Sequence, residues 1–181
     1  MNKLLFVLIV TLFVNNTTCF NKPIYSYNNI KMRTETNKCW NIKINSNPEN
    51  VYYDWLNNVW YDSYFNNNLC NSKIISIGDI YGTNSIRSMN VFNTVNQIIT
   101  NTTYPEKIEY KEVILPSINY NRGSIDFVNI NNSTELIWNI NYTKTDFELI
   151  DNIVYKIYDH VINNTLKKLK IYSERRVYQQ G

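Results

Sequence analysis

The side chains that most often perform chemistry in proteins are scarce in this chain. Its 181 residues include one His, at position 160, three Cys and four Gly. A single His excludes most His-based metal sites and triads, and the Cys residues form no CxxC motif. No GxGxxG or GxxxxGK[ST] run is present, so the sequence predicts no phosphate-binding loop. We therefore expect no catalytic residue, no metal and no cofactor, and we favour a binding protein over an enzyme.

Charge and composition exclude further classes of protein. The 18 Lys and Arg against 15 Asp and Glu give a formal net charge of +3. Because no basic run accompanies this small charge, we expect no nucleic-acid partner. Apolar residues make up 44% of the chain, and its length suits one folded domain with a sizeable core.

Residues 1–19 have the pattern of a secretory signal peptide. A lysine near the start precedes an apolar run from Leu4 to Val14, and Thr17 and Cys19 are the small residues expected before a cleavage site. The run is too short for a membrane span of roughly 20 residues. We expect a secreted, extracellular protein with no transmembrane segment in the mature chain; the alternative is an uncleaved N-terminal anchor.

Secretion would make the Asn-x-Ser/Thr motifs of the chain available for modification. Five such motifs follow residue 19, beginning at Asn101, Asn131, Asn132, Asn141 and Asn163. Three of them fall in predicted turns, one on the outer face of a strand and one opposite the apolar stripe of a helix. All five are candidates for glycosylation, so we expect a glycoprotein.

Sequence periodicity predicts an α+β domain. Alternation predicts strands at 37–45, 73–78, 84–92, 95–101, 107–115, 121–130 and 134–143. A helix start at Ser46–Glu49 introduces two short helices that run to about Phe65, with a break near Asn57-Asn58. The longest helix is predicted from Thr145 to about residue 173. His160 lies about 110° from the centre of its apolar stripe, so we expect that side chain on the surface.

Five motifs follow one another in a recognisable order: GTNSIR (82–87), YPEKIEY (104–110), GSI (123–125), STELIW (133–138) and LKKLK (166–170). The first resembles the G-S-V-R strand of the START-like, or SRPBCC, superfamily, and the second resembles its P-x-x-L-x-Y hairpin. The others resemble later strands and the end of the long helix in that superfamily. The polyketide cyclase/dehydrase-like branch is the most similar, and the likeness covers about residues 38–173.

The resemblance implies a helix-grip fold, in which a seven-stranded antiparallel sheet curls around a long C-terminal helix, with two short helices after the first strand. It divides the chain into a signal peptide (1–19), a flexible leader (20–37), the START-like domain (38–174) and a polar tail (175–181). It also implies a cavity between sheet and helix that holds a hydrophobic or amphipathic small molecule or lipid. We expect a monomer.

Strand alternation, combined with the strand faces that look inward in the superfamily, predicts the lining of that cavity. The candidates are Arg87, Met89, Val91, Gln97, Tyr110, Glu112, Trp138, Ile140 and Ile157. This mixture suits a ligand with an apolar body and one polar handle, and Arg87 is the best-placed cation for an acidic handle. Alternatives stay open for both groups. Arg87 pairs with Glu112, so that Glu112→Gln lowers the melting temperature, or Arg87 lies near the cavity mouth and holds a loop. The apolar candidates are, in the alternative, plain core packing.

Three functions are compatible with these features: a ligand carrier, a polyketide cyclase/dehydratase-type enzyme, and a ligand-free interaction domain. The sequence favours the first, because Gln97 stands where many members of the branch carry Glu, and an amide is a poor general base. If the first two strands pair antiparallel as the resemblance implies, Cys39 and Cys70 lie about 23 Å apart. We therefore expect free or intermolecular thiols and no Cys39–Cys70 disulfide.

Overall fold

The structure, a computed structural model, describes residues 35–62, 71–90, 94–113, 121–143 and 148–180. All of these ranges lie in one compact unit, Arg33–Gly181. The predicted signal peptide and residues 20–34 of the predicted leader lie outside the described residues. Within the described ranges, no helix has both the length and the apolar character needed to cross a membrane.

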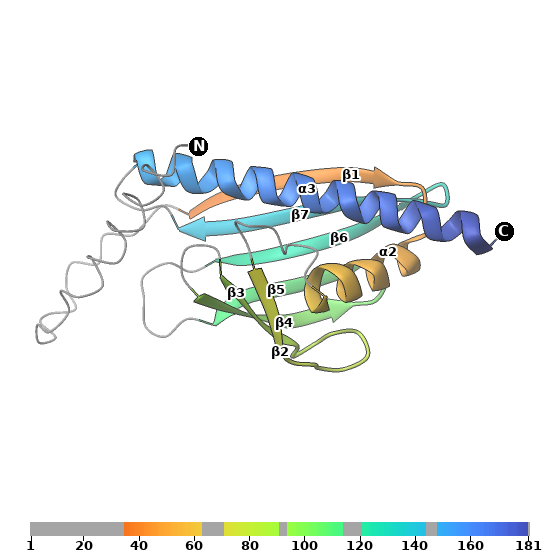
Figure 1. Ribbon diagram of the computed structural model, residues 1–181, viewed down its shortest axis with the longest axis horizontal. Helices are drawn as coiled ribbons and strands as arrows, with labels where there is room; N and C mark the ends of the chain where they lie inside the picture. Colours follow the sequence, from red (N-terminus) through yellow and green to blue (C-terminus); the bar gives the residue numbers. More distant parts are fainter. Residues whose placement is uncertain (1–34, 63–70, 91–93, 114–120, 144–147, 181) are drawn as a thin grey trace, which may run out of the picture. The chain divides into compact units, whose positions relative to one another are not determined.

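Seven strands form one sheet in which every neighbouring pair is antiparallel, in the order β1-β7-β6-β5-β4-β3-β2 (Figure 1). The strands are β1 (Glu35–Ile44), β2 (Asn71–Ser76), β3 (Ile86–Asn90), β4 (Thr94–Thr103), β5 (Lys107–Val113), β6 (Arg122–Ile130) and β7 (Ser133–Thr143). Each begins and ends within about two residues of its predicted range. The helix-grip sheet is therefore confirmed, but β1 and β2 form opposite edges, so the expectation that they pair is wrong.

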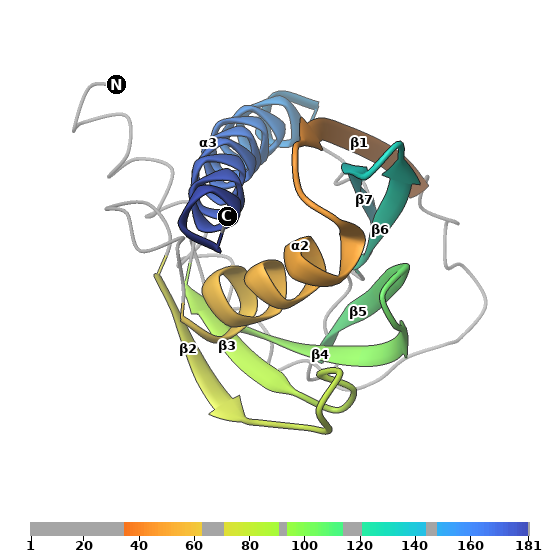
Figure 2. The ribbon, with the colours of Figure 1, turned by 90° about the vertical axis from the view of Figure 1, so that its right-hand side faces the viewer.

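Alternation of apolar and polar residues gives the sheet one buried face. In β6, Ile125 and Phe127 are buried while Ser124 and Asp126 on the other face are half-buried. Trp138 of β7 lies opposite both Ile125 and Trp40 of β1, so the inner faces of three strands meet in one apolar layer. Figure 2 shows the sheet curling, with α2 inside the curl and α3 at its opening, between the β1 and β2 edges.

The helix after β1 continues where the sequence predicts a break. In α2 (Pro48–Trp55), Asn47 caps the first turn by accepting a hydrogen bond from the Asn50 backbone N–H at 2.9 Å. The chain then passes directly into a π-helix, η1 (Leu56–Tyr61), which ends with a bond from the Asp62 N–H to the Asn57 carbonyl. The predicted break at Asn57-Asn58 is therefore wrong, because wider helical turns absorb these two residues. Residues 63–70 lie outside the described ranges.

The C-terminal helix α3 (Glu148–Gln180) is longer than predicted and lies beside β1 (Figures 1 and 2). Among the helix residues whose side chains are described, the buried ones are Val161, Ile162, Thr165, Leu166, Leu169 and Ser173. The Trp40 indole of β1 donates a hydrogen bond to Asp159 at 2.9 Å and stacks on Tyr155, which ties the helix to the sheet edge. The helix continues to Gln180, so the predicted tail after residue 174 is helical.

Candidate functional site

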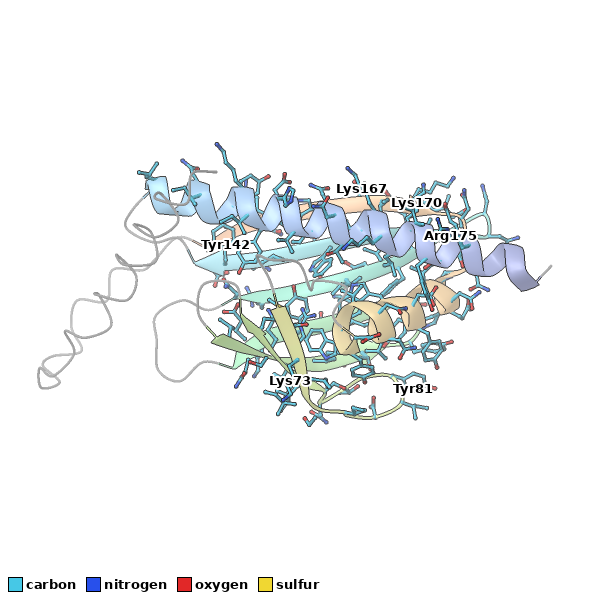
Figure 3. The ribbon with its side chains drawn as sticks, viewed as in Figure 1. Lys73, Tyr81, Tyr142, Lys167, Lys170 and Arg175 are labelled. Atoms are coloured by element: carbon cyan, nitrogen blue, oxygen red, sulfur yellow. The ribbon has the colours of Figure 1, made fainter. Side chains whose placement is uncertain are left out.

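A cavity of about 30 Å³ lies between the inner face of the sheet and α3. Its walls are Arg87, Met89, Gln97, Tyr110, Trp138, Ile140, Ile157, Tyr158, Val161 and Ile162. The first seven are predicted cavity residues, and their role in ligand binding stays a prediction. Figure 3 shows the side chains that occupy the space between the strands and α3, the helix that carries Lys167 and Lys170.

Two predicted cavity residues are not among those walls. Val91 lies outside the described residues. Glu112 is buried on β5, at 7% exposure, but it does not line the cavity. Sequence analysis missed Tyr158, Val161 and Ile162. Val161 follows Ile157 by four residues and shares its face, whereas Tyr158 and Ile162 form a second pair at the same spacing on the adjoining face of the helix.

A row of three polar side chains crosses three neighbouring strands, and two of them, Arg87 and Gln97, line the cavity. Arg87 of β3 lies opposite Gln97 of β4, and Gln97 lies opposite Glu112 of β5. The Nε and Nη2 groups of Arg87, which is only 1% exposed, donate to Gln97 Oε1 at 3.0 and 2.8 Å. Gln97 in turn hydrogen-bonds Glu112. The amide therefore lies between the two charges, and the ion pairs among the described residues do not include an Arg87–Glu112 salt bridge, which the sequence left open as an alternative.

The guanidinium of Arg87 also joins the sheet to η1. Its Nη1 donates to the Val59 carbonyl at 2.9 Å, and its central carbon lies 4.1 Å from the centre of the Trp60 ring. The last carbonyls of a helix have no partner within the helix, and they favour a cation. Arg87 therefore caps the end of η1 while its Nε–Nη2 edge holds Gln97. This arrangement gives Arg87 a structural role, which the sequence alone left as an alternative.

Burial changes the acid–base properties of Glu112. Loss of water raises the pKa of its carboxyl group to about 7, although hydrogen bonds from Asn121, at 3.0 Å, and Gln97 oppose the rise. The carboxyl group is thus partly protonated near neutral pH. Because Glu112 is absent from the cavity wall, it does not converge there with Arg87 and Tyr110 as acid–base catalysis would require.

Tyr110 and Trp138 form a hydrogen-bonded aromatic pair on the cavity wall. The Trp138 indole N–H donates to the Tyr110 hydroxyl oxygen at 2.9 Å. Burial raises the pKa of Tyr110 to about 12, so the hydroxyl keeps its proton. Gly123, opposite Tyr110 on β6, makes room for the ring, because a Cβ there would lie 2.3 Å from the tyrosine oxygen. Cross-strand pairing thus holds the hydroxyl in place.

The other described residues whose side chains could bind a metal or take part in a reaction do not gather into a site. The described ranges contain no cluster of His, Cys, Asp and Glu able to hold a metal ion. His160 is exposed, as expected, and its Nε2 lies 3.0 Å from the Asn164 amide. Cys39 is a free, exposed thiol on β1, whereas Cys70 lies outside the described residues.

The predicted glycosylation positions differ in exposure. Asn101, Asn131 and Asn132 are exposed, and the last two form the β6–β7 turn with φ angles of 50° and 63°. Asn101 is part of β4 and not of a turn, which corrects its predicted placement. Asn141 on the outer face of β7 and Asn163 on α3 are half-buried, and Asn163 donates to Asp159 at 3.0 Å.

Comparison with solved structures identifies the fold. The aromatase/cyclase Zhui from Streptomyces sp. R1128 matches with a TM-score of 0.62 and 12% identity, covering 80% of this chain and 96% of that one. A norcoclaurine synthase point mutant from Thalictrum flavum, in complex with a transition-state analogue, matches with a TM-score of 0.61 and 8% identity, covering 80% of this chain and 97% of that one. Ara h 8.0201 matches with a TM-score of 0.58 and 10% identity, covering 77% of this chain and 98% of that one.

No protein-family model matches the sequence, and no curated protein matches it. At identities this low, the solved structures establish the fold and leave the function open. They confirm the helix-grip architecture that the START-like motifs predict, over about four-fifths of the chain.

Proposed function

We propose that the protein binds a hydrophobic or amphipathic small molecule, lipid-like or polyketide-like, in the cavity between the sheet and α3. The observation that carries the proposal is the cavity's composition: apolar and aromatic side chains, with Arg87, Gln97 and the Tyr110 hydroxyl on one wall. Ligand sites typically combine an apolar lining with a few placed polar groups. The norcoclaurine synthase with the same fold is a solved complex with a small molecule.

The size of the cavity limits how a ligand can be held. A volume of about 30 Å³ has room for about two water molecules, well below the roughly 300–1,000 Å³ of typical ligand sites. Binding therefore requires side chains on the walls to move. Ile157 on α3 is a half-buried member of the wall, so its side chain has room to turn outward.

Mass spectrometry under native conditions, on protein purified from its own host, tests the proposal. We expect an apolar molecule to co-purify with the wild-type protein. Ile157→Trp should fill the cavity and reduce the amount of that molecule. Ile171→Trp is the matched control, because Ile171 lies on the same helix but is 52% exposed. Repeated isolation of wild-type protein without any bound molecule would contradict the proposal.

The small cavity also favours a second candidate, an interaction domain with a filled interior and no ligand. The same experiment separates the two, because this candidate predicts no co-purified molecule and no effect of Ile157→Trp on partner binding. A cyclase or dehydratase activity has less support, since Glu112 is bonded to Gln97 and Asn121 away from the cavity wall.

We further propose that the protein is secreted and glycosylated. The N-terminal pattern supports secretion, and the exposure of Asn101, Asn131 and Asn132 supports modification at these positions. Expression of the full chain in a eukaryotic host, followed by treatment of the medium with an N-glycosidase, is the test. Protein that stays inside the cell, or whose mass the enzyme does not change, would contradict this proposal.

A further inference from the structure

The hydrogen bond between Trp138 and Tyr110 determines where the tyrosine proton can go. An indole N–H is only a donor, so the Tyr110 oxygen must be the acceptor in this 2.9 Å contact. The hydroxyl proton must therefore point to a different atom. Tyr110 is 4% exposed and lines the cavity, and no described residue accepts this proton. A buried donor on the cavity wall is thus left for whatever the cavity holds.

The position of this donor is fixed before any ligand arrives. Gly123 lies directly opposite on β6, and its missing side chain leaves the space that the tyrosine ring fills. The Trp60 ring packs on the Tyr110 ring with 5.7 Å between centroids. Trp138 holds the oxygen itself. A donor constrained from three sides loses little freedom on binding, which favours affinity.

We propose that Tyr110 recognises the ligand by donating its hydroxyl proton to an uncharged oxygen, such as a carbonyl or ether oxygen. The ligand class that follows is a neutral, largely apolar molecule with one acceptor oxygen. This inference rests on the proposed function, because it concerns the ligand of the same cavity.

A carboxylate fits the cavity less well than a neutral acceptor. The Nε–Nη2 edge of Arg87, which could grip a carboxylate with two parallel bonds, is bound to Gln97 Oε1. An acidic ligand would have to displace Gln97, which also bonds Glu112. The carboxylate of such a ligand would lie close to the buried carboxyl group of Glu112, and burying an unpaired charge is costly. Arg87, the cation that the sequence predicts for an acidic group of the ligand, is thus already hydrogen-bonded within the protein.

Two probes of equal shape test the inference. Acetophenone carries a carbonyl oxygen where α-methylstyrene carries a CH₂ group, so the pair differs mainly in the acceptor. Their dissociation constants, measured by calorimetry for wild-type protein and for Tyr110→Phe, form a double-mutant cycle that cancels the difference in probe hydration. We expect Tyr110→Phe to lower the preference for acetophenone by about 2- to 10-fold, the range for one neutral hydrogen bond.

The matched control is Tyr155→Phe, which removes a hydroxyl from a half-buried tyrosine that stacks on Trp40 and does not line the cavity. It should leave the preference unchanged. If Tyr110→Phe does not fold, a crystal structure of the wild-type complex replaces it, with the acetophenone oxygen expected within hydrogen-bond distance of the Tyr110 hydroxyl.

The outcomes separate the inference from the function on which it rests. Binding of both probes with a preference that Tyr110→Phe does not alter would overturn the role of Tyr110 while leaving the ligand-binding function intact. Tighter binding of benzoate than of acetophenone, lost in Arg87→Lys, would overturn the neutral ligand class. Failure of both probes to bind the wild-type protein would overturn the function and the inference together.

Discussion

Glu112 provides a pH-dependent test of the buried polar row. Its folded-state pKa of about 7 lies above the value of 4.5 expected for a solvated glutamate. The folded protein therefore binds the proton more tightly than the unfolded chain does. The resulting stabilisation is fully present below about pH 4.5 and is lost as the pH rises through about 7. A rise of this size corresponds to about 3 kcal/mol, most of which is lost between about pH 5 and pH 8.

The perturbation is Glu112→Gln, which keeps the size of the side chain and removes the titration. We expect the unfolding free energy of the wild-type protein to fall by about 2–3 kcal/mol relative to the variant between about pH 5 and pH 8. The absolute unfolding free energy of the variant also reflects a changed hydrogen bond to Gln97 or Asn121. The change of unfolding free energy with pH is therefore the diagnostic quantity. Urea unfolding of both proteins at four pH values across this range measures it.

Glu109→Gln on the same strand is the matched control with the opposite sign. Glu109 lies on the outer face, where a salt bridge of 2.7 Å to Lys107 lowers the pKa of its carboxyl group. Its contribution to stability is lost as the pH falls, and it is small because both side chains are exposed. If wild-type protein and Glu112→Gln show parallel stability profiles, the burial argument is refuted. If Glu112→Gln lowers the melting temperature by the same amount at every pH, the result would favour the alternative in which Arg87 pairs with Glu112.

Substitutions at three further positions test the packing around the cavity and the attachment of α3 to β1. Gly123→Ala should lower the unfolding free energy by about 1–3 kcal/mol, because the new methyl group overlaps the Tyr110 ring; urea unfolding measures it, and an unchanged midpoint would contradict the close contact. Arg87→Met should cost about 2–5 kcal/mol in the same assay, since Gln97 and the Val59 carbonyl both lose their buried donor, and Arg87→Lys should recover only part of the loss. Asp159→Ala should cost about 1–2 kcal/mol by leaving the Trp40 indole without its acceptor, and hydrogen exchange should then increase in α3 and β1 before the rest of the sheet.

The order of the elements and most of their boundaries follow from local sequence patterns. Alternation identifies each strand because the side chains of a strand point to opposite faces in turn. The Asn47-Pro48 start identifies α2, since a capping side chain and a proline in the first turn act within a few residues. Seven of the nine predicted cavity residues line the cavity, because a strand's inward face is set by its own pattern once the sheet order is known.

Contacts between distant segments were decided only by the tertiary structure. The Val59 carbonyl that binds Arg87 comes from η1, 28 residues earlier in the chain, and no local pattern specifies that pairing. The cross-strand register places Gln97 between Arg87 and Glu112, so the amide bonds both side chains in place of the direct salt bridge that the sequence left open as an alternative. The cavity volume depends on how α3 side chains interlock with the sheet. Sequence periodicity therefore predicts which residues face inward, whereas only the packed structure determines how much space they leave and which hydrogen-bond donor remains for a ligand.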